Sequence, residues 1–114
     1  MPEPADAVQS QLAKLKKKYA AELPQKVARV EEQVGAFLAA AWSEEVCFAT
    51  YRQIHSLAGS AGTYGFAELG STARTGEHLI KKSLDGRAAL GEPDVMALAV
   101  VLSRMKELAA LAAG

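Results

Sequence analysis

This sequence is poor in several residue types, and each shortage excludes a class of protein. Its 114 residues include one cysteine, Cys47, so a disulfide framework or a cysteine metal cluster cannot form within one chain. The 13 basic and 13 acidic side chains cancel, which argues against strong electrostatic attraction to nucleic acid. The longest apolar run, residues 36–42, is far too short to span a bilayer, and the start lacks the apolar segment of a signal peptide. We therefore expect a cytoplasmic protein with no nucleic-acid or membrane partner.

Helical periodicity is what the sequence has instead, and strand-like alternation is absent. Half of the residues are apolar, which is enough for one core at this length. We expect helices over about residues 6–22, 24–41, 44–62 and 66–84, and a last helix that opens at Pro93. Pro24 disfavours helix at Leu23, which predicts a break or kink there, and Ser43 is suited to cap the next helix. Short links between amphipathic helices predict an all-α, antiparallel four-helix bundle with an additional N-terminal helix, in a single domain over residues 1–114.

The additional helix, an N-terminal extension over residues 1–22, has one apolar side. Val8, Leu12, Leu15 and Tyr19 follow helical spacing, so this side needs burial. The three lysines at positions 16–18 are interpreted as a solvated helix face rather than a binding patch. The extension could lengthen the bundle, cap it or mediate dimer contacts.

The stretch HSLAGSAGTYGF, residues 55–66, places a histidine four residues before a glycine within a predicted helix. At about 100° per residue, the core side of this helix collects Cys47, Tyr51, Ile54, Leu57, Ala58 and Ala61. His55 lies roughly 90° from the centre of that side, at the edge of the apolar stripe. Phe48, Arg52, Gly59 and Gly62 share its flank. Gly59 either leaves the imidazole open to a partner or packs closely against a neighbouring helix.

Residues 55–66 closely resemble the core signature of histidine phosphotransfer (HPt) domains. The run from Gly62 to Phe66 is similar to the phosphotransfer domain of chemotaxis histidine kinases, and the signature region spans residues 44–84. The resemblance implies a phosphorelay carrier in two-component signalling, a substrate module rather than an enzyme, with His55 as phosphoacceptor. The implied partners are a response-regulator receiver domain, whose aspartate gives or takes the phosphoryl group, and a histidine kinase. It implies no cofactor or metal site in this chain, and Mg²⁺ is expected on the receiver.

The resemblance also implies roles for side chains around His55. Glu77 falls where related domains have a glutamate that hydrogen-bonds and orients the imidazole, although a plain surface pair with Lys81 is the alternative. Ala58 stands where these domains usually have a lysine that helps bind the phosphoryl group. Arg74 stands where they have a second histidine. Arg74 and Arg52 are therefore the candidates to supply the missing positive charge.

A docking surface around His55 is expected from its neighbours. It comprises a shallow apolar patch, rimmed by Arg52, whose members are Phe48, Ala58, Gly59, Gly62 and Tyr64. Because of Ala58, an HPt-like scaffold that has lost phosphotransfer is the main alternative. A small metal or redox bundle that uses His55, His78 and Cys47 is a third hypothesis.

Overall fold

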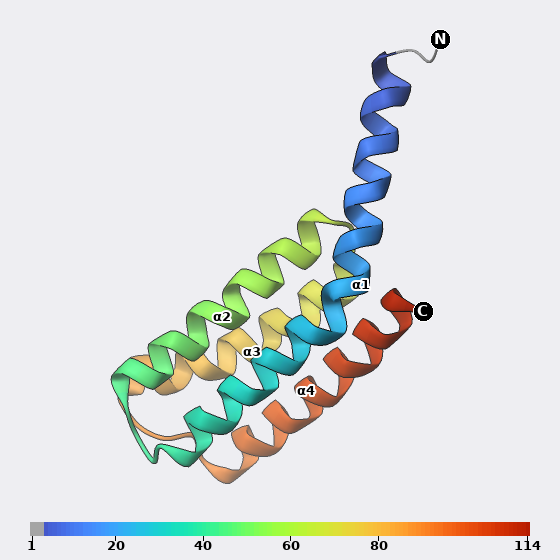
Figure 1. Cartoon of the computed structure of the whole chain (residues 1–114). Helices are drawn as coiled ribbons and strands as arrows, with labels where there is room; N and C mark the ends of the chain where they lie inside the picture. Colours follow the sequence, from blue (N-terminus) through green and yellow to red (C-terminus); the bar gives the residue numbers. More distant parts are fainter. Residues whose placement is uncertain (1–3) are drawn as a thin grey trace.

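Four helices make up the computed structural model, which describes residues 4–114 (Figure 1). They are α1 (Pro4–Ala39), α2 (Glu44–Thr63), α3 (Ala67–Gly86) and α4 (Glu92–Ala113), and the described residues contain no strand. Consecutive helices run antiparallel and pack side by side. The predicted all-α four-helix bundle is confirmed. Within residues 4–114, none of the helices is both long and apolar enough to cross a membrane.

α1 is one continuous helix, so the predicted break at Pro24, which made residues 6–22 and 24–41 two separate helices, is wrong. A proline inside a helix lacks an N–H and crowds the carbonyl one turn earlier, at a cost of about 3 kcal/mol. Leu23 and Val27, on either side of Pro24, are fully buried in the core, and this packing offsets the cost. Figure 1 shows α1 changing direction where it enters the bundle, as a proline inside a helix permits. Residues 4–18 of α1 are all exposed and project beyond the bundle; we call them the arm.

The core lies along the bundle axis, where all four helices contribute apolar side chains. α1 supplies a stripe from Leu23 to Phe37, and the other helices face it with aliphatic residues such as Ile54, Ile80 and Leu98. Each of these three side chains is almost completely buried. The 3.6-residue spacing of the apolar positions thus produces one shared core.

Local signals in the sequence place α2 and its connection to α3. The Ser43 hydroxyl accepts a hydrogen bond from the Val46 backbone N–H at 3.2 Å, so the predicted N-cap is confirmed. α2 ends at Thr63, and the turn that follows contains Gly65 with φ of +87°, a conformation that glycine adopts without strain. This tight turn returns the chain directly along α2.

α2 and α3 approach each other closely because small residues face one another. A Cβ on Gly70 would lie 3.1 Å from the Ala58 carbonyl oxygen and 3.3 Å from the Gly62 nitrogen. Any larger residue at Gly70 would push the two helices apart. This close contact holds the side chains of α3 within reach of α2.

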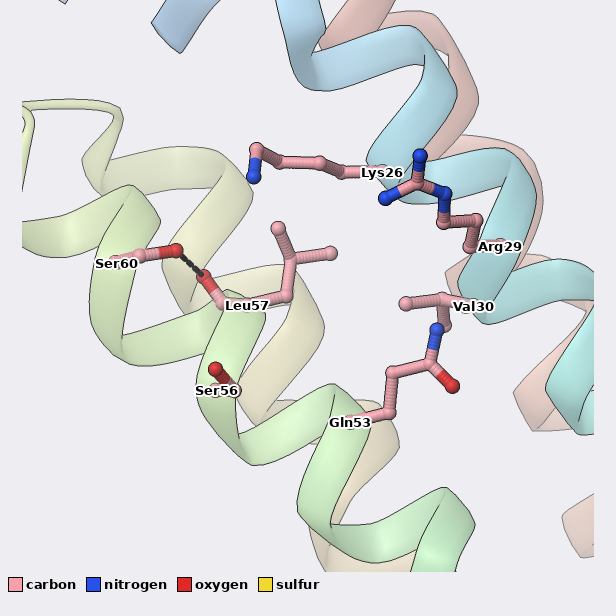
Figure 2. Close-up of a pocket in the computed structure, with 7 residues that line it drawn as sticks. All are labelled: Lys26, Arg29, Val30, Gln53, Ser56, Leu57 and Ser60. Atoms are coloured by element: carbon pink, nitrogen blue, oxygen red, sulfur yellow. Dashed lines mark hydrogen bonds between the residues drawn. The ribbon is translucent and has the colours of Figure 1, made fainter.

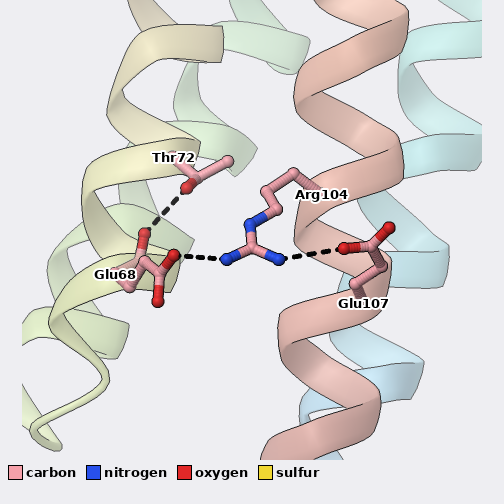
Figure 3. Close-up of polar contacts among 4 residues, drawn as sticks. All are labelled: Glu68, Thr72, Arg104 and Glu107. Atoms are coloured by element: carbon pink, nitrogen blue, oxygen red, sulfur yellow. Dashed lines mark hydrogen bonds and ion pairs between the residues drawn. The ribbon is translucent and has the colours of Figure 1, made fainter.

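Ion pairs on the surface connect α3 to α4. The Arg104 guanidinium of α4 donates to Glu68 of α3 and, at 2.9 Å, to Glu107 on its own helix (Figure 3). The Thr72 hydroxyl donates to the Glu68 carbonyl oxygen at 2.8 Å. Exposed pairs of this kind contribute little stability, so the core carries the fold.

An aromatic cluster fixes the root of the arm to the α2–α3 turn. Tyr19 stacks on Tyr64 with ring centroids 4.3 Å apart and lies 5.9 Å from Phe66. The Tyr19 hydroxyl also hydrogen-bonds the Ser60 hydroxyl at 2.6 Å. The direction in which the arm leaves the bundle is therefore set by contacts with the end of α2.

Candidate functional site

His55 lies midway along α2 with 60% of its side-chain surface exposed. Its Nδ1–H donates a hydrogen bond to Oε1 of Glu77 on α3, and the Glu77 side chain is only 6% exposed. Among residues 4–114 the imidazole makes no other hydrogen bond. A carboxylate at Nδ1 fixes the tautomer in which Nε2 keeps its lone pair. The expected position at the edge of the apolar stripe is confirmed, and most of the imidazole side chain is exposed to solvent.

The register between α2 and α3 brings Glu77 to the level of His55. Residue 66, the last residue of the turn, is the midpoint between positions 55 and 77. A count centred on Tyr64 would leave the two side chains about four residues, or roughly 6 Å, out of step along the helices. The alternative pair between Glu77 and Lys81 is wrong, because Lys81 binds Asp85 at 3.0 Å.

The second oxygen of the Glu77 carboxylate is buried without a hydrogen-bond partner. The nearest cation is Arg74, whose Nη1 lies 4.0 Å from this Oε2, while just over half of the arginine side chain remains exposed. Burying a carboxylate is costly unless it is paired, and such costs are commonly tolerated at functional sites. The imidazole, the carboxylate and the guanidinium therefore form one charged cluster across α2 and α3.

Tyr51 is a neighbour of His55, although its place on the helix predicts only a core position. Its ring stacks against the imidazole at a centroid distance of 5.8 Å and an interplanar angle of 21°. The side chain is half-buried rather than fully buried. The i, i+4 spacing of Tyr51 and His55 on one helix was the signal that could have identified this contact.

The flank of α2 around His55 is open. We call the surface formed by Phe48, Arg52, His55, Gly59 and Gly62 the His55 face. Phe48 is about half exposed, and the Arg52 guanidinium lies 5.8 Å from the centre of its ring. A Cβ added at Gly59 or at Gly62 would meet nothing within 4 Å. The alternative in which Gly59 packs closely against a neighbouring helix is therefore wrong, and a partner can approach the imidazole there.

A hollow extends the His55 face toward the start of α2. It has a volume of about 550 Å³ and is lined by Glu44, Glu45, Phe48 and Leu84. Phe48 thus belongs both to the His55 face and to a concave apolar surface. Leu84, which comes from α3, was not among the predicted docking residues.

Two predicted members of the docking surface do not lie on the His55 face. Ala58 is 1% exposed, because it points into the contact between α2 and α3. Tyr64 lies on the α1 side of α2, where it stacks on Tyr19. The helical wheel places Ala58 correctly on the core side. The prediction that Ala58 and Tyr64 belong to the docking surface is wrong.

The remaining candidate ligands are scattered. Cys47 is fully buried, its thiol donates to the Ile80 carbonyl oxygen at 3.7 Å, and burial raises its pKa. His78 is exposed on α3. In the described part of the chain, no group of three or more histidine, cysteine, aspartate or glutamate side chains is placed to hold a metal ion. The hypothesis of a metal bundle has no support in this geometry.

A comparison with known families agrees with the all-helical fold. A family model described as "Hpt domain" matches residues 14–113, which is nearly the whole chain. A comparison with curated proteins and one with solved structures each found no match. The chain therefore belongs to the Hpt domain family, whose members are phosphocarrier modules of two-component signalling.

Proposed function

We propose that this chain carries a phosphoryl group on His55, which it exchanges with the aspartate of a response-regulator receiver domain or accepts from a histidine kinase. One observation carries this proposal. An exposed imidazole has Nδ1 hydrogen-bonded to a buried carboxylate, which leaves Nε2 free to react. The open His55 face gives a partner domain room to bring its phosphoryl group to that nitrogen.

The transfer step follows from this geometry. The Nε2 lone pair of His55 attacks the phosphorus of an aspartyl phosphate, an N–P bond forms, and the P–O bond to the aspartate breaks. The aspartate leaves as a carboxylate with the bonding electron pair. The proton on Nδ1 stays in its hydrogen bond to Glu77, whose negative charge stabilises the imidazole as it becomes cationic. The reverse step returns the phosphoryl group by the same path.

Phosphoryl transfer depends mainly on positioning and electrostatics. This chain supplies the nucleophile and its orientation, and Mg²⁺ on the receiver would neutralise the phosphoryl oxygens. Ala58 provides no cation, so we assign that role to Arg74 and Arg52. Arg74 lies next to the Glu77 carboxylate, and Arg52 lies at the rim of the His55 face.

Labelling with phosphate tests the proposal. The purified chain is incubated separately with a phosphorylated receiver domain and with an active histidine kinase, and acid-labile, base-stable phosphate is measured. We expect label on the wild type and on the control His78→Gln, and none on His55→Gln. Binding of receivers without label would instead support the scaffold alternative. Label that survives in His55→Gln would refute the assignment of the phosphoacceptor.

The role of the arginines is tested in the same assay. We expect Arg74→Gln and Arg52→Gln each to slow transfer, because each removes a positive charge near the incoming phosphoryl group. Lys82→Gln, at an exposed lysine that binds Asp94 on α4, serves as the control. Unchanged rates in both arginine variants would show that the chain works without a replacement for the missing lysine.

A further inference from the structure

The arm leaves three large aliphatic side chains exposed. Val8, Leu12 and Leu15 are 59%, 58% and 49% exposed, and their spacing of four and three residues puts them in one row. At about 100° per residue, Tyr19 has the same angular position on α1 as this row, and so do the later residues of α1 that face α2. Gln33, on that side, donates to Thr50 of α2 at 3.0 Å. The exposed row is thus an extension of the α2-facing side of α1.

A groove between α1 and α2 continues from this row (Figure 2). Two adjoining hollows of about 390 and 300 Å³ share Lys26, Ser56 and Ser60 in their linings. Leu15 lines the hollow nearer the arm, so the apolar row opens into the groove. Arg29 lines the other hollow, and Figure 2 shows Lys26 extending from α1 toward α2. We call this feature the α1–α2 groove.

The arm and the α1 wall of the groove are basic. Residues 4–29 contain six lysines and arginines against two acidic side chains, Asp6 and Glu22. Residues 30–114 contain seven basic and ten acidic side chains, so the positive charge is concentrated at this end of the chain. An occupant with negative charge beside its apolar contacts therefore fits this surface best.

The width of the apolar row argues for a helix as the occupant. Lys16 and Lys18 lie about 80° to either side of the row, which leaves a narrow seam of the kind that packs against one other helix. A helix that lies in a membrane surface has a broader apolar face with aromatic residues, and residues 4–18 contain no aromatic side chain. The arm of a second copy would bring its own lysines against these lysines, so self-association is disfavoured.

We propose that the arm and the α1–α2 groove together bind one acidic amphipathic helix of a partner protein. From Val8 to Arg29 the surface spans about 32 Å, or roughly six helical turns. The leucine row receives the apolar stripe of that helix, and Lys18 and Arg29 receive its carboxylates. Lys26 lies between them, with its Nζ 4.0 Å from the Glu22 carboxylate that also lines the groove. The groove lies on the α1 side of α2, whereas His55 contacts Glu77 on the α3 side. The two surfaces therefore lie on different sides of α2, and this proposal does not rest on phosphotransfer.

Peptide binding to the full chain tests the proposal. The probe is a fluorescent four-heptad peptide with leucine at the a and d positions and glutamate at e and g; the matched peptide has lysine at e and g. We expect the acidic peptide to bind with an affinity that falls as salt is added, and the basic peptide not to bind. Comparable binding of both peptides, or binding of neither, would overturn the proposal.

Matched variants locate the binding surface. Leu12→Gln with Leu15→Gln should weaken binding at least about tenfold, since two leucines lose the apolar surface that the partner helix would bury. Lys26→Glu with Arg29→Glu should also weaken it at least about tenfold. Leu111→Gln is the control, because this leucine is 73% exposed on α4, outside the groove. A loss of binding in the control equal to that in the arm variant would refute the site, provided that circular dichroism shows all variants folded.

Two further measurements separate the other occupants. A dimer in sedimentation that Leu12→Gln dissociates would show that a second copy covers the arm and would overturn the proposal. Tighter binding to phosphatidylserine vesicles than to the acidic peptide would overturn it in favour of a membrane surface.

Discussion

Replacing Gly59 with alanine should make the protein more stable and the site less reactive. Glycine inside a helix is about 1 kcal/mol less favourable than alanine, and a Cβ at Gly59 would meet nothing within 4 Å. The free energy of unfolding should therefore rise by about 1 kcal/mol, which raises the melting temperature by about 4 °C in a domain of this size. The same Cβ lies one helical turn from His55, where a partner must approach closely. Overpacking a close contact costs about 1–3 kcal/mol, so transfer should slow by about 5- to 150-fold.

The two effects are measured separately, by calorimetry and by the initial rate of phosphate transfer from a receiver. Gly35→Ala is the matched control, because Gly35 is also within a helix and also has nothing within 4 Å of an added Cβ. It lies on α1, so it should gain similar stability without loss of transfer. Gly59→Leu should keep the fold and slow transfer further. Normal transfer by Gly59→Leu, or a fall in stability of Gly59→Ala, would refute the view that Gly59 is kept open for a partner.

Three further predictions concern Glu77, Pro24 and Cys47. Glu77→Gln should slow transfer at least about tenfold, because a charged hydrogen bond worth about 1.5–3 kcal/mol is lost. The nitrogen chemical shifts of His55 should then show a mixture of its two tautomers, and a single unchanged tautomer would contradict this prediction. Pro24→Ala should raise the melting temperature, because it restores an N–H donor to the Ala20 carbonyl; a decrease would mean that the bundle needs the bend. Cys47 should resist alkylation until the protein unfolds. Alkylation of the native protein at the rate of free cysteine would refute this. Because burial raises the pKa of the Cys47 thiol, its contribution to the free energy of unfolding is complete at neutral pH and is lost as pH rises above about 8.5.

The bundle and the flank that carries His55 could be predicted because both depend on local, periodic information. Apolar spacing located the helices, and Ser43 marked the start of α2. The position of His55 beside the apolar stripe follows from its place on one helix alone. The contact with Glu77 was anticipated by resemblance, whereas the residue count left its register open, because the conformation of the turn decides it.

Tertiary packing explains what could not be predicted. A proline has a strong local preference against helix, yet Leu23 and Val27 are so well buried that α1 continues through Pro24. The orientation of Tyr64 depends on Tyr19, which lies far away in sequence. Such contacts between distant segments leave no periodic trace in the sequence.

The aromatic cluster at Tyr19 is the point along α1 at which the helix begins to contribute to the stability of the bundle. Side chains that come before it among residues 4–18 are exposed and absent from the core, so substitutions there cost the bundle little. That stretch can consequently accept substitutions without loss of the fold, while the part that holds His55 stays under the constraint of folding. The surface chemistry of the arm can therefore change while the geometry around His55 stays the same.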